Sequence, residues 1–389
     1  MKRIALLCLL LAAAALGAQA ADTLDFTMPQ YANPIYDSFG NNYLGTSAMG
    51  RGYTGVALQG GTEYLLLNPA GYKKDKPALY LEMLIKPPVN FETSEGDDSY
   101  SSPVPFGVIG TGGSLGGGFT AAALYSLPKT IKLDDFSVRM NLGAYLLQRY
   151  PTFNLHQFTA NLAYHTGSWH FGANLHNQIW YLGDFIVLRT FERVRDFKYV
   201  PRPQFGVLYA RDGVNAGISF QPEQKVDWDL KYVQYNTVLP MNINAGLSVK
   251  TGATTISYDM GWENTAAINP DYYDRVSTHV GIETRVRKFT YRVGYSYVPE
   301  VWHGTYRLPL NTSANADTSL WWDFEPVTGN VARNNQHFIH LGTTWHHRDG
   351  SINLAFMQDL GSQDRTTQIS LSLQLYFNAF RRKGFLFFG

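Results

Sequence analysis

The feature that most constrains this chain is an alternation of apolar and polar residues in segments spread along most of its length. In Ile369–Phe377 every odd-numbered position is apolar, and most even-numbered positions are polar. Met241–Val249 and Phe289–Tyr297 repeat this pattern. Because successive side chains of a β-strand point to opposite faces, each segment predicts a strand with one apolar and one polar face.

Alternation alone fits a soluble β-sandwich as well as a membrane barrel, so other features decide between them. The predicted strands have about 10 residues or more, whereas strands of globular proteins usually have about 5 or 6. Charged residues make up only 16% of the chain, against about 25% in an ordinary soluble protein. Aromatic residues cluster at the strand ends, as the interfacial girdles of membrane barrels require: Tyr145, Tyr150, Trp180, Tyr181, Trp262, Trp302 and Trp345. We therefore predict an all-β fold, a transmembrane antiparallel β-barrel.

The alternating segments fit about fourteen strands over residues 78–389, with tight turns such as Arg348–Gly350 on one side and long connections on the other. Outer-membrane barrels have short periplasmic turns and longer external loops, which predicts periplasmic termini. Two strands are expected at 115–126 and 136–149. With these, Leu127–Asp135 is a long connection on the short side and Tyr150–Thr152 a short one on the long side.

The first 20 residues have the pattern of a secretory signal peptide. Lys2 and Arg3 precede the apolar run Ile4–Leu16, and Ala18–Ala20 gives a small-residue cleavage site. Cys8 is the only cysteine, so the expected mature chain from residue 21 offers neither a disulfide nor a thiolate site. Its nearly balanced charge gives no indication of nucleic-acid binding. We expect export to the bacterial outer membrane.

Residues 21–77 do not alternate cleanly and are rich in glycine and proline. Such a segment could be a disordered periplasmic tail or a plug folded into the barrel lumen. Tyr64, Leu65–Leu67 and Tyr72 are too apolar for a solvated tail. We therefore interpret residues 21–77 as an N-terminal hatch, followed by the barrel at 78–389.

Two motifs in this segment resemble the N-terminal hatch of the FadL family of outer-membrane transporters for long-chain fatty acids and other hydrophobic compounds. The motifs are Ser47–Ala57, with a Gly-Arg-Gly-Tyr centre, and Asn68–Gly71, with the sequence Asn-Pro-Ala-Gly. Between them, Leu58–Glu63 has one acidic residue where the family often has two aspartates. The resemblance implies a hatch or gating role for Gly50, Arg51, Gly52, Tyr53, Gly55, Asn68, Pro69, Ala70 and Gly71.

Elementary chemistry gives these motifs a structural meaning as well. Asn68 is held extended by the following Pro69, and its amide can satisfy the backbone of an irregular turn. Arg51, placed in a lumen, would seek carboxylates or carbonyls of the barrel wall. The alternative to gating is that Asn68–Ala70 is simply a turn that locks the plug in place.

The resemblance implies a monomeric, passive, porin-like channel for hydrophobic small molecules such as long-chain fatty acids, embedded in outer-membrane lipid. We expect an aromatic ligand path at Trp302, Tyr306, Trp321, Trp322 and Phe324. Six charged residues also fall on the polar face of predicted strands: Arg139, Asp259, Glu283, Arg285, Arg287 and Arg292. They either form an ion-pair network that holds the plug, or some of the cations receive a substrate carboxylate, for which we name Arg285 and Arg292. Barrels that resemble the family also serve protein secretion, so an adaptor of a secretion system is the alternative function.

No constellation in the sequence indicates catalysis, a metal or another cofactor. His337, His340, His346 and His347 do not converge on one face of a strand, as several ligands of one metal ion must. Gly110–Gly118 lacks the Lys-Ser/Thr pair of a phosphate-binding loop. No spacing singles out a Ser–His pair. We expect a protein that is not an enzyme.

Overall fold

The computed structural model describes residues 41–73, 77–86, 89–93, 96–100, 104–132, 146–187, 193–229, 234–268, 272–299, 301, 307–310, 320–323, 335–360 and 367–377. The expected signal peptide, residues 1–20, and residues 21–40 of the expected hatch lie outside this part of the chain.

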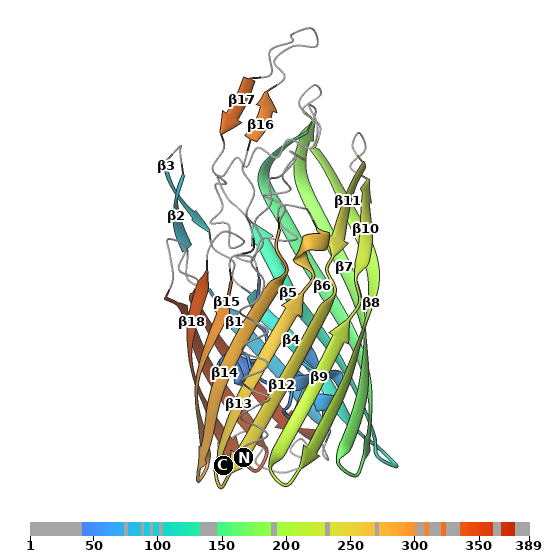
Figure 1. Ribbon diagram of the computed structural model, residues 1–389, viewed down its shortest axis with the longest axis vertical. Helices are drawn as coiled ribbons and strands as arrows, with labels where there is room; N and C mark the ends of the chain where they lie inside the picture. Colours follow the sequence, from blue (N-terminus) through green and yellow to red (C-terminus); the bar gives the residue numbers. More distant parts are fainter. Residues whose placement is uncertain are drawn as a thin grey trace.

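A closed antiparallel barrel of fourteen strands dominates the structure, as the alternation predicts (Figure 1). The barrel closes because β1 pairs with both β4 and β20. Its strands are β1 (Ala78–Ile85), β4 (Val104–Gly116), β5 (Phe119–Lys132), β6 (Leu146–Thr166), β7 (Trp169–Val187), β8 (Arg193–Arg211), β9 (Val214–Gln221), β12 (Asn242–Thr251), β13 (Thr254–Glu263), β14 (Arg275–Val286), β15 (Phe289–Val298), β18 (Gln336–His347), β19 (Gly350–Asp359) and β20 (Thr367–Tyr376).

The two ends of the barrel differ in how the strands are connected. Two-residue turns join β4–β5, β6–β7, β8–β9, β12–β13, β14–β15 and β18–β19, all at the lower end in Figure 1, which we call the tight-turn end. The barrel also starts and finishes there, since Ala78 pairs with Tyr376. The opposite, long-loop end carries the hairpins β2 (Val89–Thr93)–β3 (Gly96–Tyr100), β10 (Gln224–Asp229)–β11 (Gln234–Leu239) and β16 (Arg307–Leu310)–β17 (Leu320–Asp323).

The strand predicted at 115–126 is wrong, although the count is right. Residues 104–116 form β4, Gly117 and Gly118 form the turn, and residues 119–132 form β5. The unexpected connections disappear with this correction, because residues 127–132 continue β5 and residues 150–152 lie inside β6. Of the strand predicted at 136–149, only residues 146–149 are described, and they belong to β6. Glycine has no side chain to alternate, so residues 110–118 gave no periodic signal.

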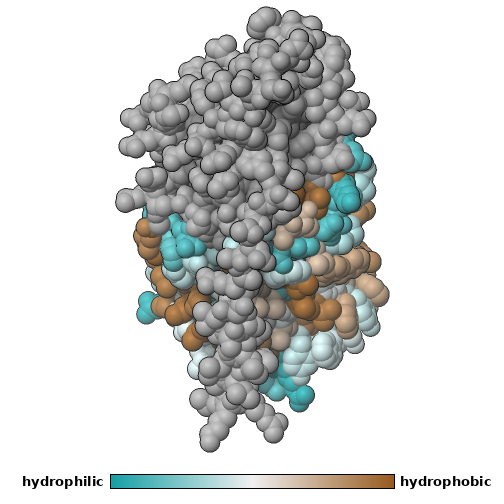
Figure 2. All heavy atoms as spheres, turned by 45° about the horizontal axis from the view of Figure 1, so that its top comes forward, coloured by the Kyte–Doolittle hydropathy of each residue, from teal (hydrophilic) through white to brown (hydrophobic). Residues whose placement is uncertain are grey.

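The described barrel wall is apolar outside and polar inside. Leu162 is 52% exposed beside Asn161 at 5%, and Leu371 is 39% exposed beside Ser370 at 0%. Apolar side chains gather on the barrel wall in Figure 2. A soluble β-protein would bury these residues, so this exterior is that of a barrel surrounded by lipid.

Aromatic side chains gather on the wall near the tight-turn end, in pairs across neighbouring strands. Ring centroids lie 4.7 Å apart in Phe119–Tyr164 and 4.9 Å apart in Trp169–Tyr209. The prediction that Trp180 belongs to a girdle is wrong: its side chain is 4% exposed, and its Nε1 donates to Gln178 Oε1 in the lumen at 3.0 Å. Tyr145 and Trp302 lie outside the described residues. No helix among the described ranges has the length and apolarity to span a membrane.

Replacing Leu341, which lies in the middle of β18 and is 50% exposed, with arginine tests the lipid-facing exterior. We expect Leu341→Arg to lower the free energy of folding into lipid vesicles by about 2–4 kcal/mol, because the charge would enter hydrocarbon. Thr251→Arg, at the rim of β12, should change it by at most about 1 kcal/mol. Urea titration in vesicles measures both values. Equal tolerance of the two changes would contradict the membrane orientation.

Candidate functional site

Residues 41–73, which we call the luminal segment, lie inside the barrel and contact its wall on several sides (Figure 1). The segment contains a short helix, α2 (Thr46–Met49), and two 3-10 helices, η1 (Thr62–Leu66) and η2 (Pro69–Gly71). Helix α2 packs against β18, β19 and β20, η1 against β4, and η2 against β6, β7 and β8. The irregular, glycine-rich part of the sequence therefore crosses the lumen from wall to wall.

The Asn-Pro-Ala-Gly motif forms a buried turn that Asn68 organises. Asn68 is extended, with φ of −146° and ψ of 119°, and its Oδ1 accepts from Ala70 N at 3.0 Å. Its Nδ2 donates to Val56 O at 2.7 Å and to Val207 O of β8 at 3.3 Å. The side chain therefore joins the two motifs to each other and to the wall. This is the turn-locking role that the sequence chemistry predicts for it.

Arg51 connects the luminal segment to the wall through a shared carboxylate. Glu283 Oε2 of β14 accepts from Arg51 Nη1 at 2.8 Å and from Arg292 Nε of β15 at 2.6 Å. Arg51 is fully buried and also donates to Thr54 O at 3.1 Å. Burial lowers the pKa of Arg51, but Tyr64 and Glu283 raise it by more, so the guanidinium stays charged. For Arg292 and Glu283 this is the ion-pair network that the sequence left as one of two possibilities, whereas Arg285 has no ion pair within the described residues.

Two further wall carboxylates accept hydrogen bonds from the backbone of the segment. Asp259 Oδ2 of β13 accepts from Gly55 N at 2.6 Å and from Val56 N at 2.8 Å. Glu82 of β1 accepts from Gly45 N with both oxygens, each at 3.0 Å. An irregular chain leaves amide groups without secondary-structure partners, and buried amides must be satisfied elsewhere. These three amides are satisfied by charge-assisted hydrogen bonds that they donate to carboxylates of the wall.

Glycines on the lumen face of the wall let the segment's backbone come close. Three pairs face each other across neighbouring strands, and we call them the glycine seats: Gly172–Gly206, Gly217–Gly246 and Gly281–Gly294. A Cβ atom at each of these positions would overlap the luminal segment: at Gly172 the Pro69 carbonyl group, at Gly217 the Val56 oxygen, and at Gly294 the Gly52 nitrogen. Glycine is required here by close approach, not by a turn.

The predicted hatch residues contact the wall and one another. Gly50 lies against Gly342, and Pro69 O accepts from Asn161 Nδ2 at 3.1 Å. Tyr53 has a left-handed backbone, with φ of 64°, and its hydroxyl donates to Leu44 O at 2.6 Å. Gly71 N donates to Asn68 O at 2.9 Å. Their role in gating stays a prediction.

The predicted ligand path is only partly within the described residues. Trp302, Tyr306 and Phe324 lie outside them. Trp321 and Trp322 belong to β17, of which the backbone alone is described. An aromatic path at the long-loop end therefore stays a prediction.

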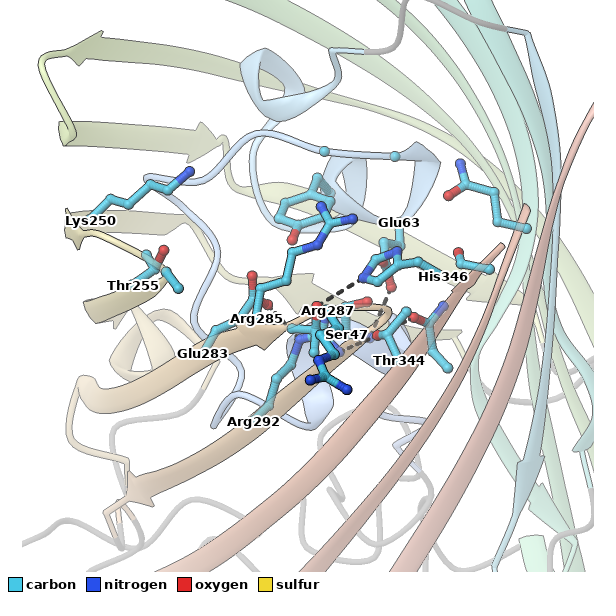
Figure 3. A pocket seen from close by; sticks show the side chains of 18 of the residues that line it. Ser47, Glu63, Lys250, Thr255, Glu283, Arg285, Arg287, Arg292, Thr344 and His346 are labelled. Carbon is cyan, nitrogen blue, oxygen red and sulfur yellow. Dashed lines mark hydrogen bonds and ion pairs between the residues drawn. The ribbon is translucent and has the colours of Figure 1, made fainter. Parts of the chain in front are cut away.

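The two predicted arginines of the path lie at the opposite end. Arg285 and Arg292 line a polar cavity of about 480 Å³ between the luminal segment and the wall (Figure 3). Gly252 and Ala253, which form the β12–β13 turn, also line it, as does Arg287 of the β14–β15 turn. The cavity thus belongs to the tight-turn end, whereas the predicted aromatic path belongs to the long-loop end.

Apolar side chains also pack between the luminal segment and the wall. One cluster joins Met49, with Tyr43 and Tyr53 packed against it, to Phe338 and Met357 near the long-loop ends of β18 and β19. A second cluster has these buried members: Leu44, Leu65, Tyr72, Tyr80, Leu84, Val104, Val108, Ala122 and Leu124. Leu84 and Val104 lie at the long-loop ends of β1 and β4, whereas Tyr80 and Ala122 lie near the tight-turn ends of β1 and β5, so this cluster extends along the wall. The lumen is therefore partly apolar, which strict alternation does not predict.

The glycine seats were missed by sequence reasoning, although a signal exists. Gly246 follows Asn242 and Asn244 on the polar face of its strand, and Gly294 follows Arg292. A glycine in place of a polar residue on the lumen face marks the approach of another backbone.

The lumen-lining histidines serve as ordinary hydrogen-bonding groups of the wall. His176 contacts Thr159 Oγ1 at 2.7 Å, and His340 contacts Ser296 Oγ at 2.8 Å. No group of three metal-binding side chains occurs within the described ranges.

Replacing Arg51 with methionine should loosen the luminal segment. A hydrogen bond to a charged group contributes about 1.5–3 kcal/mol, so local opening should become about ten times more frequent or more. The thiol introduced by Val56→Cys, on a side chain that is 4% exposed, reports opening through its maleimide labelling rate. Arg211→Met, which removes a cation from an exposed pair with Asp212, is the matched control. Equal labelling in both backgrounds would contradict anchoring by Arg51.

Gly294→Ala tests the glycine seats. The added methyl overlaps the Gly52 backbone, which cannot rotate away, so we expect a cost of about 1–3 kcal/mol and a lower midpoint of thermal unfolding. Gly261→Ala is the control, because its methyl meets side-chain atoms, Asn244 Oδ1 at 2.7 Å and Ser277 Oγ at 2.8 Å, which can rotate. Unfolding followed by circular dichroism in detergent compares the two. An unchanged midpoint for Gly294→Ala would show that the segment does not rest there.

Comparison with known proteins gives a fold but no sequence relative. No protein-family model and no curated protein matches the chain. The toluene transporter TbuX of Ralstonia pickettii is similar, with a TM-score of 0.60 and 12% identity over 86% of this chain and 98% of TbuX. The monoaromatic hydrocarbon channel CymD gives 0.59 and 12% over 89% and 98%. The P. putida toluene transporter TodX gives 0.59 and 13% over 86% and 98%. The chain therefore has the fold of the FadL-type outer-membrane transporters, as its sequence motifs indicate.

Proposed function

We propose that this protein is a passive outer-membrane channel for hydrophobic small molecules. In this proposal it is a monomer without a cofactor, and the luminal segment is the central part of a hatch spanning residues 21–77. The tight-turn end faces the periplasm. The observation that carries the proposal is the pair of apolar clusters between the luminal segment and the wall.

The polarity of the lumen favours apolar cargo over polar solutes. General porins have a polar, water-filled interior, whereas here Leu44, Leu65 and Met49 close the lumen together with apolar wall residues. Burying apolar groups is favourable by about 0.8 kcal/mol per CH₂ group. A polar amide or hydroxyl that enters without a hydrogen-bond partner loses about 2–7 kcal/mol. The difference makes such a path selective for hydrophobic molecules.

The cargo class follows from the same chemistry. The solved proteins of this fold are described as toluene transporters and monoaromatic hydrocarbon channels, and the sequence motifs resemble transporters of long-chain fatty acids. Hydrocarbons and alkyl tails both suit the apolar clusters. The aromatic stretches at Trp302–Tyr306 and Trp321–Phe324 would make the first contact with such molecules outside the membrane.

Passage requires the luminal segment to move, because its backbone lies against the wall at the glycine seats. The Arg51–Glu283 pair and the amides held by Asp259 are the contacts that such a movement would break. No energy source is needed in this scheme, since binding of cargo among the apolar side chains shifts the segment between two positions.

Mass spectrometry of compounds that stay bound through purification tests the proposal. We expect an apolar molecule with the full chain and none with a deletion of residues 21–70, because the deletion removes one side of both apolar clusters. Heat-modifiable migration in gels confirms that the deleted form still makes a barrel. An empty full-length barrel that copurifies with a periplasmic or surface protein would instead favour a secretion adaptor.

A further inference from the structure

Two histidines face each other on the lumen side of the wall, close to the tight-turn end. His165 near the end of β6 and His170 near the start of β7 are directly opposite in the register of the two strands. His170 is 3% exposed beside Trp169 at 49%, which places the pair on the lumen face. The two Nδ1 atoms are 2.7 Å apart, and the ring centroids 4.8 Å. By contrast, His176 and His340 use their ring nitrogens for contacts with hydroxyl groups.

A neighbouring hydroxyl group determines where the proton of His165 lies. Two neutral imidazoles come this close when one nitrogen carries a proton and the other a lone pair. Thr120 Oγ1 donates its single proton to Tyr72 O at 3.5 Å, so it accepts from His165 Nε2 at 3.2 Å. His165 is therefore protonated on Nε2, and its Nδ1 lone pair points at His170. Metal-binding histidines are usually oriented in this way, by a hydrogen bond from the second ring nitrogen to an oxygen atom.

We propose that His165 and His170 form a chelating site for a divalent transition-metal ion, Cu²⁺ or Zn²⁺. Neutral imidazole is a common ligand of both ions, and Cu²⁺ binds a given nitrogen site more tightly than Zn²⁺. With metal–nitrogen distances of about 2.0–2.1 Å, two ligands of a tetrahedral site lie about 3.3 Å apart. The two Nδ1 atoms must therefore separate by about 0.6 Å from the observed distance. His165 is only half-buried, so its ring has room for this movement.

Metal binding changes the position of one proton. Without metal, His170 Nδ1 donates to His165 Nδ1. With metal, both Nδ1 atoms are ligands and His170 carries its proton on Nε2, so both rings stay neutral. Two protein ligands leave the other coordination positions to water. The metal ion should therefore exchange readily, unlike the ion of a structural site that has four protein ligands.

The site would connect the wall to the end of the luminal segment. Thr120 joins His165 to Tyr72, which is 1% exposed and belongs to the second apolar cluster. The next residue, Lys73, is exposed, and its charge acts on both histidines. A metal ion between the rings would be repelled by this ammonium group. Removing the charge of Lys73 should therefore strengthen metal binding.

Electron paramagnetic resonance of Cu²⁺ bound to the full, tag-free chain in a neutral detergent tests the site, because the spectrum reports the number of nitrogen donors. We expect two nitrogen donors with one Cu²⁺ ion per chain. His165→Gln and His170→Gln should each weaken binding about tenfold or more in isothermal titration calorimetry, since each removes one arm of the chelate. Lys73→Gln should strengthen binding about twofold or more.

His156→Gln is the matched control on the same strand, because the ring of His156 contacts the Tyr125 hydroxyl at 2.8 Å rather than another imidazole. It should leave Cu²⁺ binding unchanged. Zn²⁺ should raise the midpoint of thermal unfolding of the unmodified chain but not of His165→Gln. Heat-modifiable migration in gels confirms that each variant forms a barrel.

Three results would overturn the site. Two nitrogen donors that persist in both His165→Gln and His170→Gln would show that other histidines bind the ion. A single nitrogen donor in the unmodified chain would exclude the chelate, and the absence of Cu²⁺ binding would leave only a hydrogen bond between the two rings. None of these results depends on the proposed channel function, because the site does not require a particular cargo.

Discussion

The structure depends on one constraint: an irregular segment inside a membrane barrel must satisfy its backbone polar groups without help from bulk water. The wall meets this demand with carboxylates, Asp259 and Glu82, that accept from amides of the luminal segment. It also uses neutral groups, such as Asn161 donating to Pro69 O. The polar lumen face of a barrel normally contacts water. Here the side chains of the lumen face provide the hydrogen bonds that a neighbouring strand would otherwise provide to the backbone of the luminal segment.

The distribution of side chains around the luminal segment gives the barrel a direction. On the long-loop side the segment is packed by apolar residues such as Met49 and Phe338. On the tight-turn side it faces Arg285, Arg287 and Lys250. The apolar residues and the cations can both be identified in the sequence, but only the fold shows that both groups lie against the luminal segment.

Alternation predicts the barrel class and the strand count because a strand in lipid must be apolar on every outward position. Alternation does not locate the strands at residues 110–118, because glycines have no side chain that distinguishes the lipid-facing from the lumen-facing side. The motifs around Arg51 and Asn68 predict contacts that are observed. A buried guanidinium needs carboxylate or carbonyl acceptors, and an asparagine before proline usually hydrogen-bonds the backbone of its own turn. The sequence does not show that Glu283 and Asp259 are the wall residues that contact the luminal segment, because the position of the segment relative to distant strands cannot be inferred from local sequence. Trp180 was misplaced because an aromatic residue near a strand end can face either side.

The glycine seats have a consequence for how the luminal segment can move. Contacts between side chains can be lost gradually, because each side chain has several rotamers of similar energy. The glycine seats have no rotamers, and four of the six glycines lie directly against backbone atoms of the luminal segment: Gly172, Gly217, Gly281 and Gly294. A small displacement therefore cannot be absorbed locally. For a luminal segment that moves as we propose, these backbone contacts would form or break together, which favours two discrete positions over an opening of continuously variable width.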